Sequence, residues 1–74
     1  MSNSVRSVTR AIQLLRAYTV ERPELSLSEL SVLTRLPKST CLRLLRTLQR
    51  EQMVTEVSDD RYKLGPEILR LGHV

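Results

Sequence analysis

The sequence predicts a small, mainly α-helical domain that ends in one β-hairpin. Apolar residues recur at helical spacing in three stretches between residues 7 and 51, and this period is lost after Gln52. Two short β-prone stretches then flank a turn signal. The chain has 74 residues, enough for one domain with one modest core. We therefore expect no separate active-site cleft.

The first helix is predicted over residues 7–20, with Ser7 as its N-cap. Its buried face is predicted from the apolar residues that share one side of the helix, namely Val8, Ala11, Ile12, Leu15 and Tyr18. Leu14 is expected at the edge of that face. The next segment, 21–25, contains Pro23 and several charges, and it is predicted to be a loop.

The second helix is predicted over residues 27–34. Ser26 and Glu29 have the spacing of a capping box, in which each side chain satisfies the other residue's backbone N–H. The residues expected to share its buried face are Leu27, Leu30, Leu33 and Thr34. A helix this short needs tertiary contacts to be stable.

The third helix is predicted over residues 37–51, because Pro37 suits a first helical turn. A buried stripe is expected at Cys41, Leu44, Leu45 and Leu48. The opposite side is polar and carries Ser39, Arg43, Arg46 and Arg50, bordered by Thr40 and Thr47. The hairpin is predicted from residues 53–57 and 61–64, and another helix is expected to begin at Glu67.

The charges are unevenly distributed along the chain. The formal net charge is +4, and the stretch from Arg35 to Arg50 holds five basic residues and no acidic one. Solvated helix faces usually mix both signs, which allows ion pairs at i,i+4 spacing. The arginines of the third helix have no such partner, and a phosphate-rich ligand would explain this. The pattern favours nucleic acid over a membrane surface.

Two helices joined by a tight turn predict a helix-turn-helix. Ser31 is a small residue at the expected crossing point, and Leu36 would fill the turn. With the hairpin as a wing, the predicted fold is a winged helix-turn-helix whose third helix enters the major groove of DNA. In the wing, DNA contact is favoured for Arg61. For Lys63, phosphate contact and protection of an edge strand by charge remain open.

Several classes of function are disfavoured. Cys41 is the single cysteine, which excludes an intrachain disulfide, and it is expected to be a small buried apolar residue. His73 is the single histidine, so we predict no metal site, no cofactor and no catalytic residue. No apolar run has the length of a membrane span. We expect a cytoplasmic location and no membrane partner.

Several segments resemble the N-terminal domain of the isocitrate lyase regulator (IclR) family. They are Ser7-Val8-Thr9-Arg10-Ala11-Ile12, Leu27-Ser28-Glu29-Leu30-Ser31, Leu36-Pro37-Lys38-Ser39-Thr40, Arg43-Leu44-Leu45 with Leu48, and Tyr62-Lys63-Leu64-Gly65. The resemblance implies a bacterial repressor or activator that binds an operator as a dimer or tetramer. It also implies a C-terminal domain, absent here, that binds a small-molecule effector.

By that resemblance, the groove-facing residues are Ser39, Thr40, Arg43 and Thr47, and Lys38 lies near a phosphate. With the basic residues Arg46, Arg50 and Arg61, these form the predicted DNA site. Family members often have glycine where Arg35 and Gln52 stand. If those positions are left-handed, a residue other than glycine costs about 1 kcal/mol there.

The predicted organisation is a DNA-binding domain over residues 1–66 and the start of a linker helix over 67–74. We therefore expect the chain to be a piece of a longer natural protein. The predicted function is sequence-specific binding of a pseudo-palindromic double-stranded operator. The alternative is a winged-helix protein–protein interaction module. RNA binding is disfavoured because Tyr18 and Tyr62 are the only aromatic residues.

Overall fold

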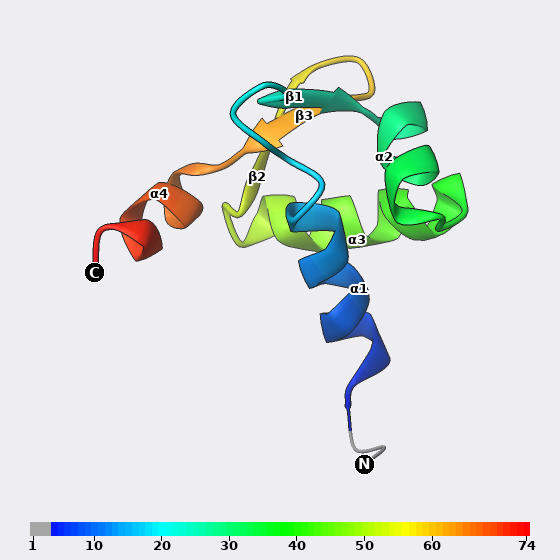
Figure 1. Ribbon diagram of the computed structural model, residues 1–74, viewed down its shortest axis with the longest axis horizontal. Helices are drawn as coiled ribbons and strands as arrows, with labels where there is room; N and C mark the ends of the chain where they lie inside the picture. The colour runs from blue at the N-terminus through cyan, green and yellow to red at the C-terminus, as the bar shows by residue number, and fades with distance from the viewer. Residues whose placement is uncertain (1–3) are drawn as a thin grey trace.

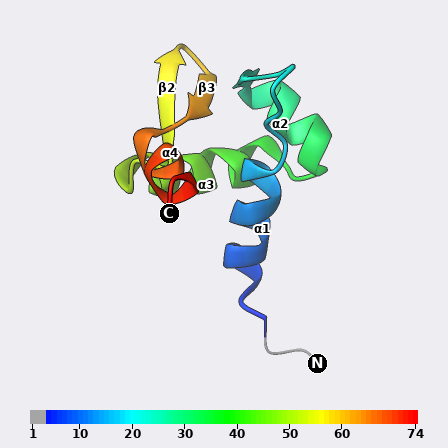
Figure 2. The ribbon, with the colours of Figure 1, turned by 60° about the vertical axis from the view of Figure 1, so that its left-hand side comes forward.

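The computed structural model describes residues 4–74 and confirms the winged helix-turn-helix fold. In chain order the elements are α1 (Arg6–Leu15), β1 (Glu24–Ser26), α2 (Leu27–Thr34), α3 (Lys38–Arg50), β2 (Val54–Ser58), β3 (Arg61–Leu64) and α4 (Pro66–Gly72). Figure 1 shows α2 and α4 at opposite ends of α3. Figure 2 shows β2 and β3 rising from one side of α3, while α1 extends away on the other. None of the described helices is long and apolar enough to span a bilayer.

The sheet has a third strand that the sequence did not predict. β1 pairs antiparallel with β3, which lies between β1 and β2. Leu25, predicted to be in a loop, lies opposite Tyr62 and is fully buried. Ser26 ends the strand and is at once the N-cap of α2. The expected capping box is present, with Glu29 N donating to Ser26 Oγ at 3.1 Å and Ser26 N donating to Glu29 Oε1 at 2.8 Å.

The predictions for the first helix were wrong in length and in rotation. It begins at Arg6 and ends at Leu15, and its N-cap is Val5 instead of Ser7. Leu14, expected at the edge, has no exposed surface, whereas Val8 and Ile12 are 54% and 41% exposed. The side of α1 that carries Leu14 is the one that packs into the core. The apolar spacing along the sequence favours the face with Val8 and Ile12, because the burial of Leu14 depends on how the other elements pack against α1.

The core lies where the three helices meet the sheet. Its buried members are Leu14, Tyr18, Leu25, Leu30, Cys41, Leu45, Val54 and Tyr62. Cys41 is buried as expected, and Leu44 and Leu48 of the predicted stripe are half-buried against this core. Leu33, which was expected to face the core from α2, is exposed instead. The hydroxyl of Tyr18 donates to the carbonyl of Tyr62 at 3.0 Å, and burial raises the pKa of Tyr18 to about 12.

The end of α3, the end of the hairpin and the start of α4 meet at one junction. Gln52 has a left-handed backbone with φ 62°, as does Arg35 between α2 and α3 with φ 61°. The N–H of Gly65 donates to the carbonyl of Met53 at 2.8 Å, and the N–H of Glu67 donates to the carbonyl of Gln52 at 3.1 Å. A Cβ on Gly65 would lie 2.4 Å from the Gln52 oxygen, so this position requires glycine.

Candidate nucleic-acid interface

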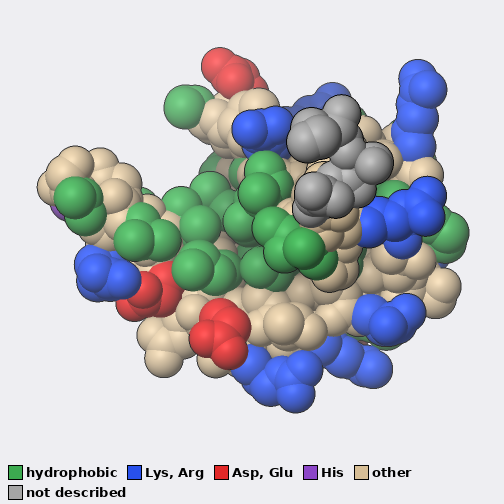
Figure 3. All heavy atoms as spheres, turned by 90° about the horizontal axis from the view of Figure 1, so that it is seen from below, with side chains coloured by type: hydrophobic (Ala, Val, Ile, Leu, Met, Phe, Trp, Pro, Cys, Tyr) green, Lys and Arg blue, Asp and Glu red, His purple; other side chains and the backbone are tan. Residues whose placement is uncertain are grey.

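The helix α3 presents one polar, basic side to solvent. Its exposed residues on that side are Lys38, Ser39, Arg43, Arg46, Thr47 and Arg50, and Thr40 is half-buried. Cys41 and Leu45, on the other side, are fully buried. Seven of the eight residues of the predicted DNA site therefore belong to one helix whose orientation is fixed by the core. Figure 3 shows that Lys and Arg side chains gather along the edges of the molecule beside an apolar surface.

The arginines of α3 carry uncompensated charge. Over residues 4–74 the recorded ion pairs involve Arg61 and Arg70 only, and none involves an arginine of α3. Arg50 Nη2 donates to Thr47 Oγ1 at 3.4 Å, and that hydroxyl donates to the carbonyl of Arg43 at 3.4 Å. Guanidinium groups and hydroxyls on one exposed helix face are the groups that contact base edges and phosphates in DNA.

The turn between α2 and α3 sets the direction of α3. Ser31 is a small residue where α2 and α3 cross, and it also forms a hydrogen bond there. Its hydroxyl donates to the carbonyl of Leu36 at 2.6 Å. The hydroxyl of Thr34 donates to the carbonyl of Leu30 at 2.7 Å and accepts from the N–H of Leu36 at 3.3 Å. Together with the left-handed Arg35, these bonds fix the turn from both sides.

Arg61, the eighth predicted residue, lies in the wing and is half-buried. Its Nε donates to Glu24 Oε1 at 3.1 Å, and its Nη1 lies 3.9 Å from Glu29 Oε1. The hydrogen bonds from Ser26 lower the pKa of Glu29, and the charge of Arg61 lowers it further. Arg61 therefore links the wing to β1 and to the start of α2. Lys63 is exposed on the same strand.

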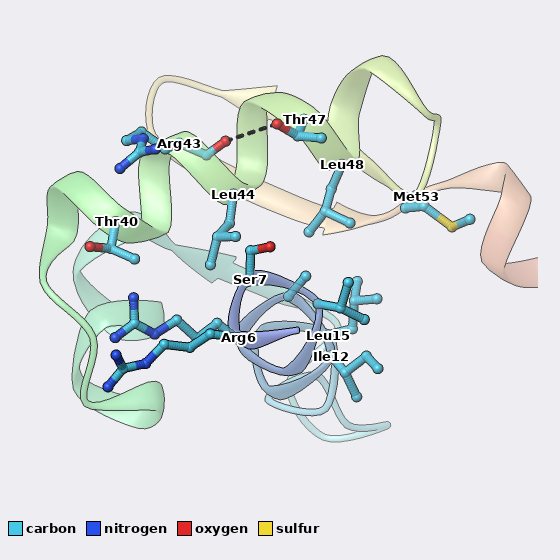
Figure 4. A pocket seen from close by; sticks show the side chains of 13 residues that line it. Arg6, Ser7, Ile12, Leu15, Thr40, Arg43, Leu44, Thr47, Leu48 and Met53 are labelled. Atoms are coloured by element: carbon cyan, nitrogen blue, oxygen red, sulfur yellow. Dashed lines mark hydrogen bonds between the residues drawn. The ribbon is translucent and has the colours of Figure 1, made fainter. Parts of the chain in front are cut away.

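A hollow of about 630 Å³ lies on the surface between α1 and α3. Its apolar part is lined by Val8, Ala11, Ile12, Leu15, Leu44, Leu48 and Met53, and its polar part by Arg6, Ser7, Arg10, Thr40, Arg43 and Thr47. We call this the α1–α3 hollow (Figure 4). Arg6 and Arg10 are not among the residues of the predicted DNA site. The one signal for them in the sequence is that these two like charges stand four residues apart on one helix.

Comparison with known proteins agrees with this geometry. A family model described as the IclR helix-turn-helix domain matches residues 7–58.

The chain belongs to this family.

Among its relatives, the glycerol operon regulatory protein of Streptomyces coelicolor is 40% identical over 97% of the chain and 29% of its own length. The crystal structure of an IclR-family transcriptional regulator from Brucella abortus has a TM-score of 0.89 and 33% identity. That match covers 96% of this chain and 27% of the other. An IclR-family regulator from Rhodococcus sp. has a TM-score of 0.83 and 40% identity over 99% of this chain and 30% of its own.

The chain thus spans less than a third of the length of these relatives. The predicted family resemblance is confirmed, and the relatives are transcriptional regulators, not enzymes. An IclR helix-turn-helix is a DNA-binding domain, and this chain has that domain with the exposed basic side of α3 available for contact.

Proposed function

We propose that this chain reads double-stranded DNA by placing α3 in the major groove, as the DNA-binding end of a transcriptional regulator. The observation that carries the proposal is the exposed side of α3, where the arginines have no ion pair within residues 4–74. The major groove admits a helix of this kind, and phosphates would supply the missing negative charge.

The residues of α3 divide into two proposed roles. Arg43 is near the middle of the helix and contacts base edges, with Ser39, Thr40 and Thr47 beside it. Lys38 begins the helix and contacts a phosphate, as do Arg46 and Arg50. For Arg61 we propose a phosphate contact from the wing. Its guanidinium would bind DNA while it remains beside Glu24.

The proposed protein context is a longer cytoplasmic regulator that binds its operator as a homodimer or tetramer. Residues 1–66 form the DNA-binding domain, and residues 67–74 begin a linker helix toward a domain that binds a small-molecule effector. The helix α4 supports this division, because it begins at Pro66 and has no buried residue, in contrast to the three helices of the domain. A dimer would present two copies of α3 to a pseudo-palindromic site.

Selection of bound duplexes from a random library provides the test. A bidentate arginine–guanine contact contributes about 1–3 kcal/mol of discrimination. Arg43→Ala should therefore weaken binding to the selected site about 5- to 150-fold more than binding to a scrambled duplex. Lys38→Ala should weaken both equally, and Arg16→Ala, on the surface after α1, should change neither.

Equal losses on both duplexes with Arg43→Ala would contradict base contact by this residue. Specificity would then have to come from Ser39, Thr40, Thr47 or DNA shape. Full affinity in both Arg43→Ala and Lys38→Ala would remove α3 from the interface altogether.

A further inference from the structure

Two arginines of α1 reach the same side of the α1–α3 hollow as the predicted DNA-contacting residues of α3. Arg6 is the first residue of α1, and Arg10 follows one turn later. Both line the hollow together with Thr40 and Arg43. In Figure 4 the side chains of Arg6 and Arg43 extend toward the same side, with Thr40 between them. Three guanidinium groups and a hydroxyl therefore surround one concave surface.

No carboxylate balances these charges. The first acidic residue of the chain is Glu21, and α3 contains none. Over residues 4–74, no ion pair is recorded for Arg6, Arg10 or Arg43. Like charges at i,i+4 destabilise a helix by a few tenths of a kcal/mol, and a cation in the first turn also opposes the helix dipole. The positions of Arg6 and Arg10 are thus unfavourable for α1 itself and favourable for an anion.

The polar end of the hollow adjoins the N-terminal half of α3, where Thr40 and Arg43 lie. In a helix-turn-helix, this half of the second helix contacts the base edges. An anion held between Arg6, Arg10 and Thr40 would therefore lie beside the groove that α3 enters. In duplex DNA the group at that place is a backbone phosphate.

We propose that α1 is part of the DNA interface, with Arg6 and Arg10 binding a backbone phosphate at the edge of the groove occupied by α3. This inference rests on the function proposed above and extends it from one helix to two. The phosphate contact from α1 positions α3 along the groove, which leaves Arg43 free for a base. Binding at two sides of the groove fixes the register of the helix better than contacts from α3 alone.

The test compares three charge-removing variants of one segment in the full 74-residue chain. Arg6→Gln and Arg10→Gln remove cations from the hollow, whereas Arg16→Gln removes an exposed cation outside it. Affinity for a duplex of random sequence is measured over a range of salt concentrations. Losing one phosphate contact lowers affinity about five- to tenfold at 0.1 M salt and makes the log–log slope shallower by about one. We expect this result for Arg6→Gln and for Arg10→Gln, and no change in slope for Arg16→Gln.

Thermal unfolding separates a lost contact from a damaged fold. Arg6→Gln removes a cation from the first turn of α1, so its melting temperature should stay equal or rise slightly while its affinity falls. Arg10 is half-buried, so Arg10→Lys, which keeps the charge and a long aliphatic stem, should retain most of the affinity.

The inference is overturned if Arg6→Gln and Arg10→Gln keep the wild-type salt slope while Lys38→Ala flattens it. In that case the proposed function stands without α1. Competition by inorganic phosphate gives a second readout. Weaker duplex binding by the wild type in phosphate than in chloride at equal ionic strength, with no such difference in Arg6→Gln, would support the inference, because free phosphate would compete with the duplex for this site.

Discussion

Gly65 shows how one residue determines the junction between the wing and the helices. Its missing side chain lets β3 end against the carbonyl of Gln52, which itself has a left-handed backbone. The sequence predicts that Gly65 ends the hairpin, because glycine and proline follow an alternating strand. It does not predict the close approach to Gln52, because that contact depends on how α3 ends.

Gly65→Ala should destabilise the domain by about 1–3 kcal/mol, because the new methyl group would meet main-chain atoms that cannot rotate away. Urea unfolding followed by circular dichroism measures this loss. Gly72→Ala is the matched control, since a Cβ at Gly72 has no neighbour within 4 Å and should leave the midpoint unchanged or slightly raised. Equal midpoints for Gly65→Ala and the wild type would mean that the junction is looser than the structure indicates.

Glu29 is a residue whose ionisation makes the stability of the fold depend on pH. Its pKa is lowered in the folded state, first by the hydrogen bonds from Ser26 and then by the charge of Arg61. A carboxyl group with a lowered pKa stabilises the fold above its unfolded pKa of about 4.3 and loses that contribution as the pH falls through its folded pKa. The melting temperature should thus decline below about pH 4.3.

Glu29→Gln retains the shape of the capping box and removes the titrating group. Its melting temperature should change less between pH 5 and pH 3 than that of the wild type. Glu51→Gln, which removes an exposed carboxylate outside the capping box, should follow the wild-type curve. Parallel curves for Glu29→Gln and the wild type would show that Glu29 does not contribute to the decline.

At the scale of elements, local signals predicted α2, α3 and the hairpin, because their caps, breakers and apolar stripes lie within each segment. Two features depend on partners far along the chain and were missed. β1 is a strand because β3 pairs with it, and its own sequence contains only one buried residue, Leu25. In the same way, Arg61 pairs with Glu24 across 37 residues, which no local pattern indicates.

The rotation of α1 gives the sharpest prediction at this scale. Leu14→Ala should destabilise the domain by about 2–5 kcal/mol, because Leu14 is completely buried in the core. Ile12→Ala, on the exposed side toward the α1–α3 hollow, should cost less than about 1 kcal/mol. Chemical denaturation of both variants decides between the two rotations. A larger loss for Ile12→Ala would favour the buried face predicted from the sequence.

At the scale of the whole molecule, charge is separated from the hydrophobic core and concentrated on α3 and the start of α1. The sequence predicted the basic side of α3 because its residues recur with one helical period. It could not place Arg6 and Arg10 beside Arg43, because only the packing of α1 against α3 brings them to one hollow. Site residues that lie on one element can therefore be predicted from the sequence, whereas residues that meet from two different elements cannot.

The most direct test of DNA binding through this basic surface is a salt titration of duplex affinity. Each phosphate contact releases counterions, so the logarithm of the association constant should fall linearly with the logarithm of the salt concentration. With Lys38, Arg46, Arg50, Arg61 and the arginines of α1 as proposed contacts, the slope should be about −4 to −6. A slope near zero would contradict the account, because binding would then not depend on the uncompensated charges of α3 and α1.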